Sequence, residues 1–452
     1  MKRLAIIAAT AIFSLNIFAQ DELSKYDNLQ NWRPNDQRGL NVFEDPKTDV
    51  EFEGVRVRIG GDFALQFQGL NQTNTAMSYS DDTAGYIKHY GMNPASLFLD
   101  TLTADFNLPT ANFNIDAQFA DGLRMHLRTY LSARHHAEAW VKGGYLQIDK
   151  LDFIKEGLAS GLMEMITIRV GMDEINYGDA HFRRTDNGRA IFNPFVGNYI
   201  MDAFTTEAFG EVLFRKSGII AMAAISNGKL NQSVVNNNKS LAPVVYFKAG
   251  YDDQITEDLR VRITGSGYIS SLSYDNGTYL FGGDRGGSRY YKLFSPMGND
   301  FSGRFNPRLK SYNSFQGALF SKFKGAEFFG FYEAVMGDNN DGDTYVDASY
   351  TQVGAELLYR FGSMEQFYLG GRYNMVTGNG YAAGTDDAGV DYDAAPATRI
   401  TRVNVGGGWF LTKNIMTKVE YVQQGYYGSG WDYSEFQGAE FNGVVLEAAI
   451  SF

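Results

Sequence analysis

Apolar and polar residues alternate with a period of two along much of this chain, which is the pattern of β-strands with two chemically different faces. In the segment 55–69, Val57, Ile59 and Phe63 fall on one face, and Arg58 and Asp62 fall on the other. About 16 segments are predicted as strands: residues 55–69, 107–119, 122–134, 138–150, 164–171, 204–215, 218–227, 243–252, 257–271, 309–323, 326–337, 348–361, 365–377, 398–411, 414–425 and 439–452. Two short runs, 97–103 and 288–294, would raise the count to about 18 if they are strands.

The connections between these segments alternate between long and short. Most even-numbered connections contain only a few residues, such as 120–122, 216–217 and 324–325, although 151–163 is longer. All odd-numbered connections except 134–137 span from about 10 to about 37 residues. Transmembrane barrels combine short periplasmic turns with longer extracellular loops and an even number of strands. The pattern therefore predicts an all-β fold, a transmembrane antiparallel β-barrel of about 16 strands.

Composition supports this prediction and limits the partners. The chain has 50 Gly, only 9 Pro and 15% aromatic residues, which suits tight turns, barrel curvature and membrane interfaces. No apolar run after residue 20 reaches the roughly 18 residues that a spanning helix needs. Lipid of the outer membrane is therefore an expected partner. Nucleic acid is not, because the net charge is −12 and no basic tail or stripe is present.

The chain divides into three parts. Residues 1–19 have the pattern of a secretory signal peptide, with a basic start, an apolar stretch and Ala19 before a polar segment. Residues 20–54 are too short for an independent domain and are predicted to be an irregular periplasmic or lumenal segment. Residues 55–452 form the predicted barrel. There is no Cys, and no spacing of residues predicts a metal site, a cofactor or a catalytic group.

The last strand candidate ends on an aromatic residue. Val444, Leu446, Ala448 and Ile450 alternate up to Phe452. This ending resembles the closing strand of outer-membrane β-barrels, and the resemblance implies that Phe452 is an assembly signal that helps mark the chain for insertion into the outer membrane.

The whole architecture resembles that of bacterial outer-membrane porins, most closely the phosphate-selective porin family in a form typical of Bacteroidetes. The specific pieces are Val170-Gly171-Met172, which leads into a charged third long connection, and the terminal segment 446–452. The resemblance implies a 16-stranded barrel, usually a homotrimer, that passes small hydrophilic or anionic solutes passively. The chain departs from the phosphate-specific members because its third connection is not rich in lysine.

The third long connection, at about 172–203, carries charges of both signs together with aromatic residues and Pro194. In porins the third loop folds into the barrel and sets the constriction. By this resemblance the predicted pore constriction consists of Arg183, Arg184 and Arg189 with His181, facing Asp173, Glu174, Asp179 and Asp186. The alternative is a solvated external loop whose charges pair locally, and the sequence favours the two about equally.

Basic residues also recur on the predicted inward faces. They would line the lumen wall: Arg56, Arg58, Arg124, His126, Arg128, Arg169, Arg260, Arg262 and Arg372. Such a wall would either create a field that favours anions or be neutralised by carboxylates such as Asp116 and Glu356.

These patterns predict an outer-membrane porin, a passive diffusion channel for small hydrophilic solutes with a modest anion preference. An alternative is an accessory or substrate-specific barrel in a larger outer-membrane assembly. An enzyme is not expected, because the sequence shows no nucleophile–base arrangement.

Overall fold

The structure is a computed structural model. It describes residues 29–75, 99–132, 138–230, 243–270, 280–282, 291–293, 303–341, 344–380, 383–385, 391–432 and 434–452. The predicted signal peptide, residues 1–19, lies outside these ranges. Parts of the two additional strand candidates lie outside them too, and the described residues 99–103 and 291–293 form no strand.

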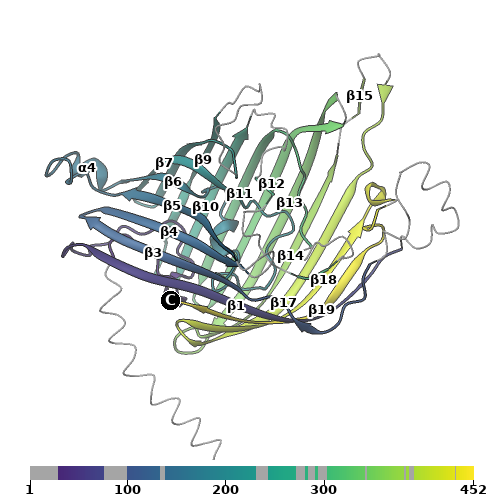
Figure 1. Cartoon of the computed structure of the whole chain (residues 1–452), viewed down its shortest axis with the longest axis horizontal. Helices are drawn as coiled ribbons and strands as arrows, with labels where there is room; N and C mark the ends of the chain where they lie inside the picture. The colour runs from purple at the N-terminus through teal and green to yellow at the C-terminus, as the bar shows by residue number, and fades with distance from the viewer. Residues whose placement is uncertain are drawn as a thin grey trace, which may run out of the picture.

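Sixteen long strands form a closed antiparallel barrel, as the alternation predicts (Figure 1). They are β1 (Arg56–Thr73), β3 (Thr110–Ala120), β4 (Leu123–Ser132), β5 (Glu138–Ile148), β6 (Ile166–Glu174), β7 (Thr206–Lys216), β8 (Ile219–Ser226), β9 (Val244–Gln254), β10 (Leu259–Ser270), β11 (Tyr312–Phe323), β12 (Ala326–Asp341), β13 (Thr344–Phe361), β14 (Phe367–Asn379), β17 (Thr398–Thr412), β18 (Ile415–Tyr427) and β19 (Glu440–Ser451). Every predicted strand is present, with boundaries within a few residues.

Several short strands and helical turns lie outside the sixteen long strands. They are β2 (Asp105–Phe106), which pairs with β1, the β15 (Gly384–Thr385) and β16 (Asp391–Tyr392) pair, α4 (Ser160–Met163), and the 3-10 turns η1 (Gln37–Gly39), η4 (Ala180–Arg183) and η5 (Ser429–Trp431). One predicted connection is wrong. The segment between 337 and 348 was expected to be a loop, but β12 and β13 stay paired from Gly337 and Ala348 to Asp341 and Thr344. Backbone pairing continues there although the side chains are polar, because a strand ladder depends on the main chain.

The barrel closes where β1 meets β19, with Asp62 opposite Ser451 and Thr73 opposite Glu440. Beyond this ladder, Phe452 exchanges two backbone hydrogen bonds of 3.0 Å with Gly61. A Cβ atom on Gly60 would lie 2.5 Å from the carbonyl oxygen of Phe452, so only glycine allows the chains to approach so closely. The terminal residue therefore completes the closing seam.

The outward faces of the strands form an apolar band. Val57, Ile59 and Leu357 are each more than 60% exposed, whereas their polar neighbours turn inward. At the end of the barrel with the short turns, Tyr359, Phe361, Phe367 and Trp409 stack in a row with ring centroids 5.5 to 6.3 Å apart. Aromatic girdles of this kind sit at the membrane interface. A closed barrel with a lipid-facing band places this protein in the outer membrane.

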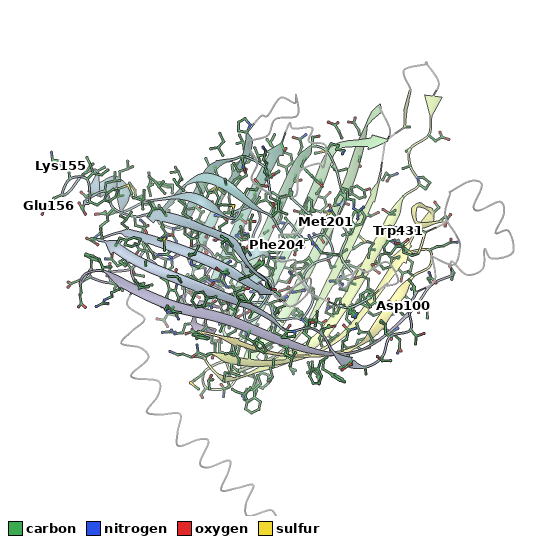
Figure 2. The ribbon with its side chains drawn as sticks, in the orientation of Figure 1. Asp100, Lys155, Glu156, Met201, Phe204 and Trp431 are labelled. Atoms are coloured by element: carbon green, nitrogen blue, oxygen red, sulfur yellow. The ribbon has the colours of Figure 1, made fainter. Side chains whose placement is uncertain are left out.

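Among the described residues, no helix is long and apolar enough to cross a membrane. Figure 2 shows Met201 and Phe204 within the barrel, Lys155 and Glu156 at one rim beside α4, and Asp100 and Trp431 at the other rim. The interior is therefore occupied by side chains of the long connections.

The topology predicts which loops face the cell exterior. The barrel rule places the short β13–β14 turn in the periplasm and the β14–β17 connection outside. A Gly380→Cys variant should be labelled on intact cells by a membrane-impermeant thiol reagent, and Ser363→Cys should be labelled only after the outer membrane is opened. Labelling of Ser363→Cys alone on intact cells would show the inverted orientation. The protein has no Cys of its own, so the background is clean.

The seam predicts an assembly defect. Deletion of Phe452 removes the two main-chain bonds to Gly61 as well as the exposed terminal ring, so we expect less folded barrel in the outer membrane and more periplasmic degradation. The measurement is the amount of heat-modifiable barrel on a gel. Phe452→Tyr keeps the ring and the main-chain bonds and is the matched control. An unchanged yield for the deletion would contradict a role of this residue in assembly.

Candidate functional site

Residues 29–54, called the N-terminal segment below, cross the interior at the end with the short turns. Gln30 bonds Asp121 in the β3–β4 turn at 2.8 Å. Farther along, the amide of Gln37 donates to the carbonyl of Lys413 in the β17–β18 turn at 2.8 Å, and Asn41 donates to Glu327 of β12 at 2.7 Å. These contacts join opposite sides of the barrel wall, so the segment spans the mouth at the end with the short turns.

Two acidic residues of this segment neutralise the inner wall. Glu44 accepts two bonds of 2.8 Å from Arg262, and Asp45 lies 2.6 Å from Arg124 and 2.7 Å from Arg169. Burial alone would raise the pKa of the Asp45 carboxyl, but Arg169 and Arg124 together hold it well below its usual range. For the same reason the pKa of Glu44 is about 2, because Arg262 and Lys248 outweigh its burial. Both groups are therefore ionised at neutral pH.

The third long connection joins β6 to β7, spans residues 175–205 and folds into the barrel. Arg183 lies 3.2 Å from Glu356 on β13 and also bonds Asn41 of the N-terminal segment. Arg184 forms a two-pronged pair with Asp202 of the same connection, at 3.0 and 2.5 Å, and lies over the ring of Phe204. Both guanidiniums are almost completely buried and are held by carboxylates.

The carboxylates predicted to face these arginines mostly pair elsewhere. Asp179 bonds Arg262 and Lys248 of the wall, and Asp186 bonds Arg128 at 2.9 Å as well as Lys142 and Tyr130. Glu174 does lie near a loop arginine, with its Oε1 atom 3.6 Å from Arg184. The loop is thus anchored to the wall by alternating charges, and the expected division into a basic side and an acidic side is absent.

His181 is not placed for proton transfer. Its ring stacks on Phe182 with centroids 3.8 Å apart, and its Nδ1 atom is buried without a hydrogen-bond partner. Burial, followed by the nearby charge of Lys248, lowers the pKa of His181 well below its usual value. The imidazole is therefore neutral and acts as part of the packing.

Nearly all of the predicted wall residues lie beside carboxylates. The pairs are Arg56 with Glu53, Arg124 with Asp116 and Asp45, His126 with Asp116, Arg128 with Asp186, Arg169 with Asp45, Arg260 with Asp252, Arg262 with Glu44 and Asp179, and Arg372 with Glu356. Arg58 lies over the ring of Trp32, 4.2 Å from its centroid. The wall is therefore largely salt-bridged, which was the alternative to an anion-favouring field.

A polar cavity of about 110 Å³ remains between the N-terminal segment, the third connection and the wall of β3 to β7. We call it the lumen cavity. Its charged and ionisable lining residues are Arg33, Glu44, Asp45, Asp116, Arg124, His126, Arg128, Tyr145, Arg169, Asp173, Glu174, His181 and Arg189. Among the described residues, neither Arg33 nor Arg189 has a carboxylate within 4.0 Å. These two guanidiniums are the exposed positive charges of the cavity.

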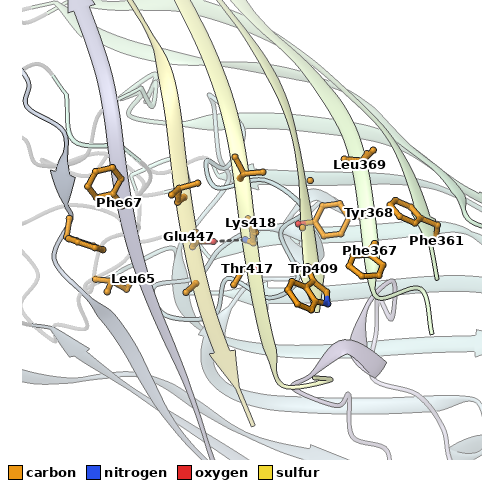
Figure 3. A pocket seen from close by; sticks show the side chains of 16 residues that line it. Leu65, Phe67, Phe361, Phe367, Tyr368, Leu369, Trp409, Thr417, Lys418 and Glu447 are labelled. Atoms are coloured by element: carbon orange, nitrogen blue, oxygen red, sulfur yellow. Dashed lines mark ion pairs between the residues drawn. The ribbon is translucent and has the colours of Figure 1, made fainter. Parts of the chain in front are cut away.

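Apolar packing closes much of the remaining interior. Ile175, Tyr177, Val196 and Ile200 of the third connection join Val244, Tyr246 and Tyr268 of the wall in one buried cluster. A larger pocket of about 820 Å³ lies on the outer surface, lined by Phe67, Phe367, Trp409 and Leu446 (Figure 3). Behind it the Lys418–Glu447 pair faces the interior, at 2.6 Å. That pocket faces lipid and is separate from the lumen cavity.

Sequence reasoning missed several residues of the site. Arg33, Glu44 and Asp45 lie outside the strand pattern, so alternation carries no information on them. Lys142 of β5 occupies an inward position and is buried against Asp186. The signal that could have found the acidic pair is its neighbourhood: Phe43-Glu44-Asp45-Pro46 combines charge with residues that pack, in a segment too short to fold alone.

Comparison with known proteins supports the fold. No family model matches the chain, and no curated protein matches it. Among solved structures, the anion-selective porin from Comamonas acidovorans covers 88% of this chain and 100% of its own, with a TM-score of 0.50 and 9% identity. The outer membrane channel DcaP of Acinetobacter baumannii covers 88% of this chain and 98% of its own, with a TM-score of 0.48 and 13% identity. The OmpF protein of Salmonella typhi in complex with daunomycin covers 88% of this chain and 98% of its own, with a TM-score of 0.47 and 12% identity.

The likeness at a TM-score of 0.50 shows a shared fold, that of an outer-membrane porin barrel, and its 9% identity shows no more than the fold.

The ion pairs predict that the N-terminal segment is held by charge. Asp45→Asn would leave Arg124 and Arg169 short of a buried partner, a loss of roughly 3 kcal/mol for a broken buried pair. We expect the segment to become sensitive to protease and the barrel to unfold at a lower temperature. Glu53→Gln in the exposed pair with Arg56 is the matched control and should change little.

The same pair predicts a pH dependence with a defined sign. The pKa of Asp45 is lower in the folded protein than its ordinary value of 3.8, so its stabilisation is present above pH 4 or so and is lost as the pH falls below that value. Wild-type protein should therefore lose protease resistance in the segment between about pH 4 and pH 2, and Asp45→Asn should show a smaller change. Equal acid sensitivity of both proteins would contradict this assignment.

Proposed function

We propose that this protein is an outer-membrane porin through which small hydrophilic solutes diffuse passively, with a modest preference for anions. The observation that carries the proposal is the lumen cavity, a polar space inside a closed barrel that is bounded by the inserted third connection and the N-terminal segment. A barrel of 16 strands leaves room for an aqueous channel, and inserted segments narrow it.

The anion preference is attributed to the two cations without carboxylate partners. Arg33 and Arg189 both line the lumen cavity, whereas the other arginines of its lining lie beside Asp45, Asp116 or Asp186. A paired arginine acts as a dipole, and an unpaired one attracts anions over about 10 Å at 0.1 M salt.

A second candidate is a substrate-specific or accessory barrel in a larger outer-membrane assembly. The observation that favours it is the extent to which the third connection fills the interior with apolar side chains. A general diffusion pore needs a wider water-filled path than a selective one. The resemblance to phosphate-selective porins of the Bacteroidetes and a homotrimeric assembly belong to the proposal as well, and chemical cross-linking of the purified protein in detergent tests the trimer.

Planar bilayers test the proposal directly. Purified protein should give discrete conductance steps without partner proteins, and its reversal potential under a salt gradient should indicate anion preference. Arg189→Glu should shift the reversal potential toward cations, most strongly at low salt. Lys155→Glu, which changes an exposed charge near α4, is the control and should leave it unchanged.

An absence of conductance from protein that is correctly folded on a gel would overturn the channel proposal and favour the accessory barrel. A wild-type reversal potential for Arg189→Glu would show that the lumen cavity does not control permeation.

A further inference from the structure

Some basic and some acidic side chains that line the lumen cavity have an atom that makes no hydrogen bond. The Nε atom of Arg189 is buried with no hydrogen-bond partner, and so are Oδ1 of Asp173 and Oε1 of Glu174. All three residues line the same cavity. Leaving such groups unpaired in a protein interior is costly, and those of a native protein require an explanation.

The positive side is built by two arginines around one ring. The Cζ atoms of Arg33 and Arg189 lie 4.1 and 4.6 Å from the centroid of the Phe192 ring. The two Cζ atoms are therefore no farther apart than the sum of these two distances. Burial, followed by the repulsion of Arg189, lowers the pKa of Arg33, which agrees with two like charges held close together.

The geometry of Arg33 leaves part of it available. Its Nε donates to the carbonyl of Gly39 at 3.1 Å and its Nη2 donates to the carbonyl of Phe182 at 3.2 Å. These bonds fix the plane of the guanidinium between the N-terminal segment and the third connection. Such a fixed fork suits a carboxylate, which accepts two parallel bonds.

The negative side lies on β6. Asp173 and Glu174 are neighbours at the end of this strand, and Oε1 of Glu174 lies 3.6 Å from Nη1 of Arg184, beyond hydrogen-bond distance. An ammonium group has three donors and would satisfy both free acceptors. A simple anion would satisfy the arginines but would face these carboxylates across a small space, and a simple cation would face the arginines.

Resting on the proposed channel, we infer that the lumen cavity is a binding site for a small zwitterion of the amino-acid type. Its carboxylate lies between Arg33 and Arg189, and its ammonium group lies at Asp173 and Glu174. Such a solute brings both charges at once to a cavity that is lined by side chains of both signs, and its net charge of zero adds no repulsion. The N-terminal segment thereby contributes a specificity-determining residue.

Three small solutes separate the parts of the site. Alanine carries both charges, propionate carries only the carboxylate, and ethylammonium carries only the ammonium group. Calorimetry on the full-length mature protein in detergent should give the tightest binding for alanine, by roughly tenfold over each of the others, as expected for one more charge-assisted contact. Equal binding of alanine and propionate would overturn the inference in favour of a plain anion site.

Variants of the lining residues test which side chain binds the carboxylate and which binds the ammonium group. Arg189→Gln and Arg33→Gln should weaken binding of alanine and of propionate, and Asp173→Asn should weaken binding of alanine but not of propionate. Arg33→Lys should restore part of the affinity, which a merely structural role of Arg33 would not predict. Arg38→Gln, which removes a half-exposed charge of the same segment outside the cavity, is the control.

The inference and the channel proposal fail separately. Conductance without any preference for alanine in calorimetry overturns the zwitterion site and leaves the channel intact. Alanine binding without conductance supports the site and overturns the channel. Heat-modifiability on a gel shows for each variant that the barrel has folded. An unchanged alanine affinity in folded Asp173→Asn also overturns the inference.

Discussion

The arginines on the inner wall impose a constraint that the rest of the interior satisfies. A strand with period two sends every polar residue to one side, and in this barrel that side carries Arg124, Arg169 and Arg262 at close quarters. Buried charges are costly unless they are paired and hydrogen-bonded. The wall alone supplies too few carboxylates near them. Glu44, Asp45 and Asp179 come from the N-terminal segment and the third connection, so these segments supply part of the negative charge that the wall arginines need.

The two inserted segments also stabilise each other. Asn41 bonds Arg183, and the ring of Phe43 packs edge-on against Phe182 at 5.5 Å. The guanidinium of Arg33 lies over Phe192 and donates to the carbonyl of Phe182. The N-terminal segment is therefore a structural support of the third connection. A change in either one should propagate to the lumen cavity, because the cavity is the space that the two leave between them.

The strands could be predicted from the sequence because alternation is a local property. In the last strand, for example, the side chains of Val444 and Leu446 point outward and those of Phe441 and Val445 point inward. This alternation follows directly from the period of two. The length of the β12–β13 hairpin could not be predicted, since Asp338 and Asn339 look like loop residues although their backbones remain paired. The ion-pair partners of Asp179 and Asp186 could not be predicted from the sequence either. They depend on which strands stand opposite the inserted loop, and only the closed barrel brings Arg262, Lys248 and Arg128 to that point.

Paired and unpaired arginines contribute differently to the electrostatic field inside the barrel. Arg128 and Arg372 are buried, yet each is matched by a carboxylate and contributes a local dipole. Counting basic residues on the inward faces therefore overestimates the positive field. Among the described residues that line the lumen cavity, Arg33 and Arg189 have no carboxylate within 4.0 Å, and Oδ1 of Asp173 and Oε1 of Glu174 accept no hydrogen bond. The net field inside the barrel therefore depends on the few charges that folding leaves without close partners, and these come from the N-terminal segment, the third connection and the end of β6.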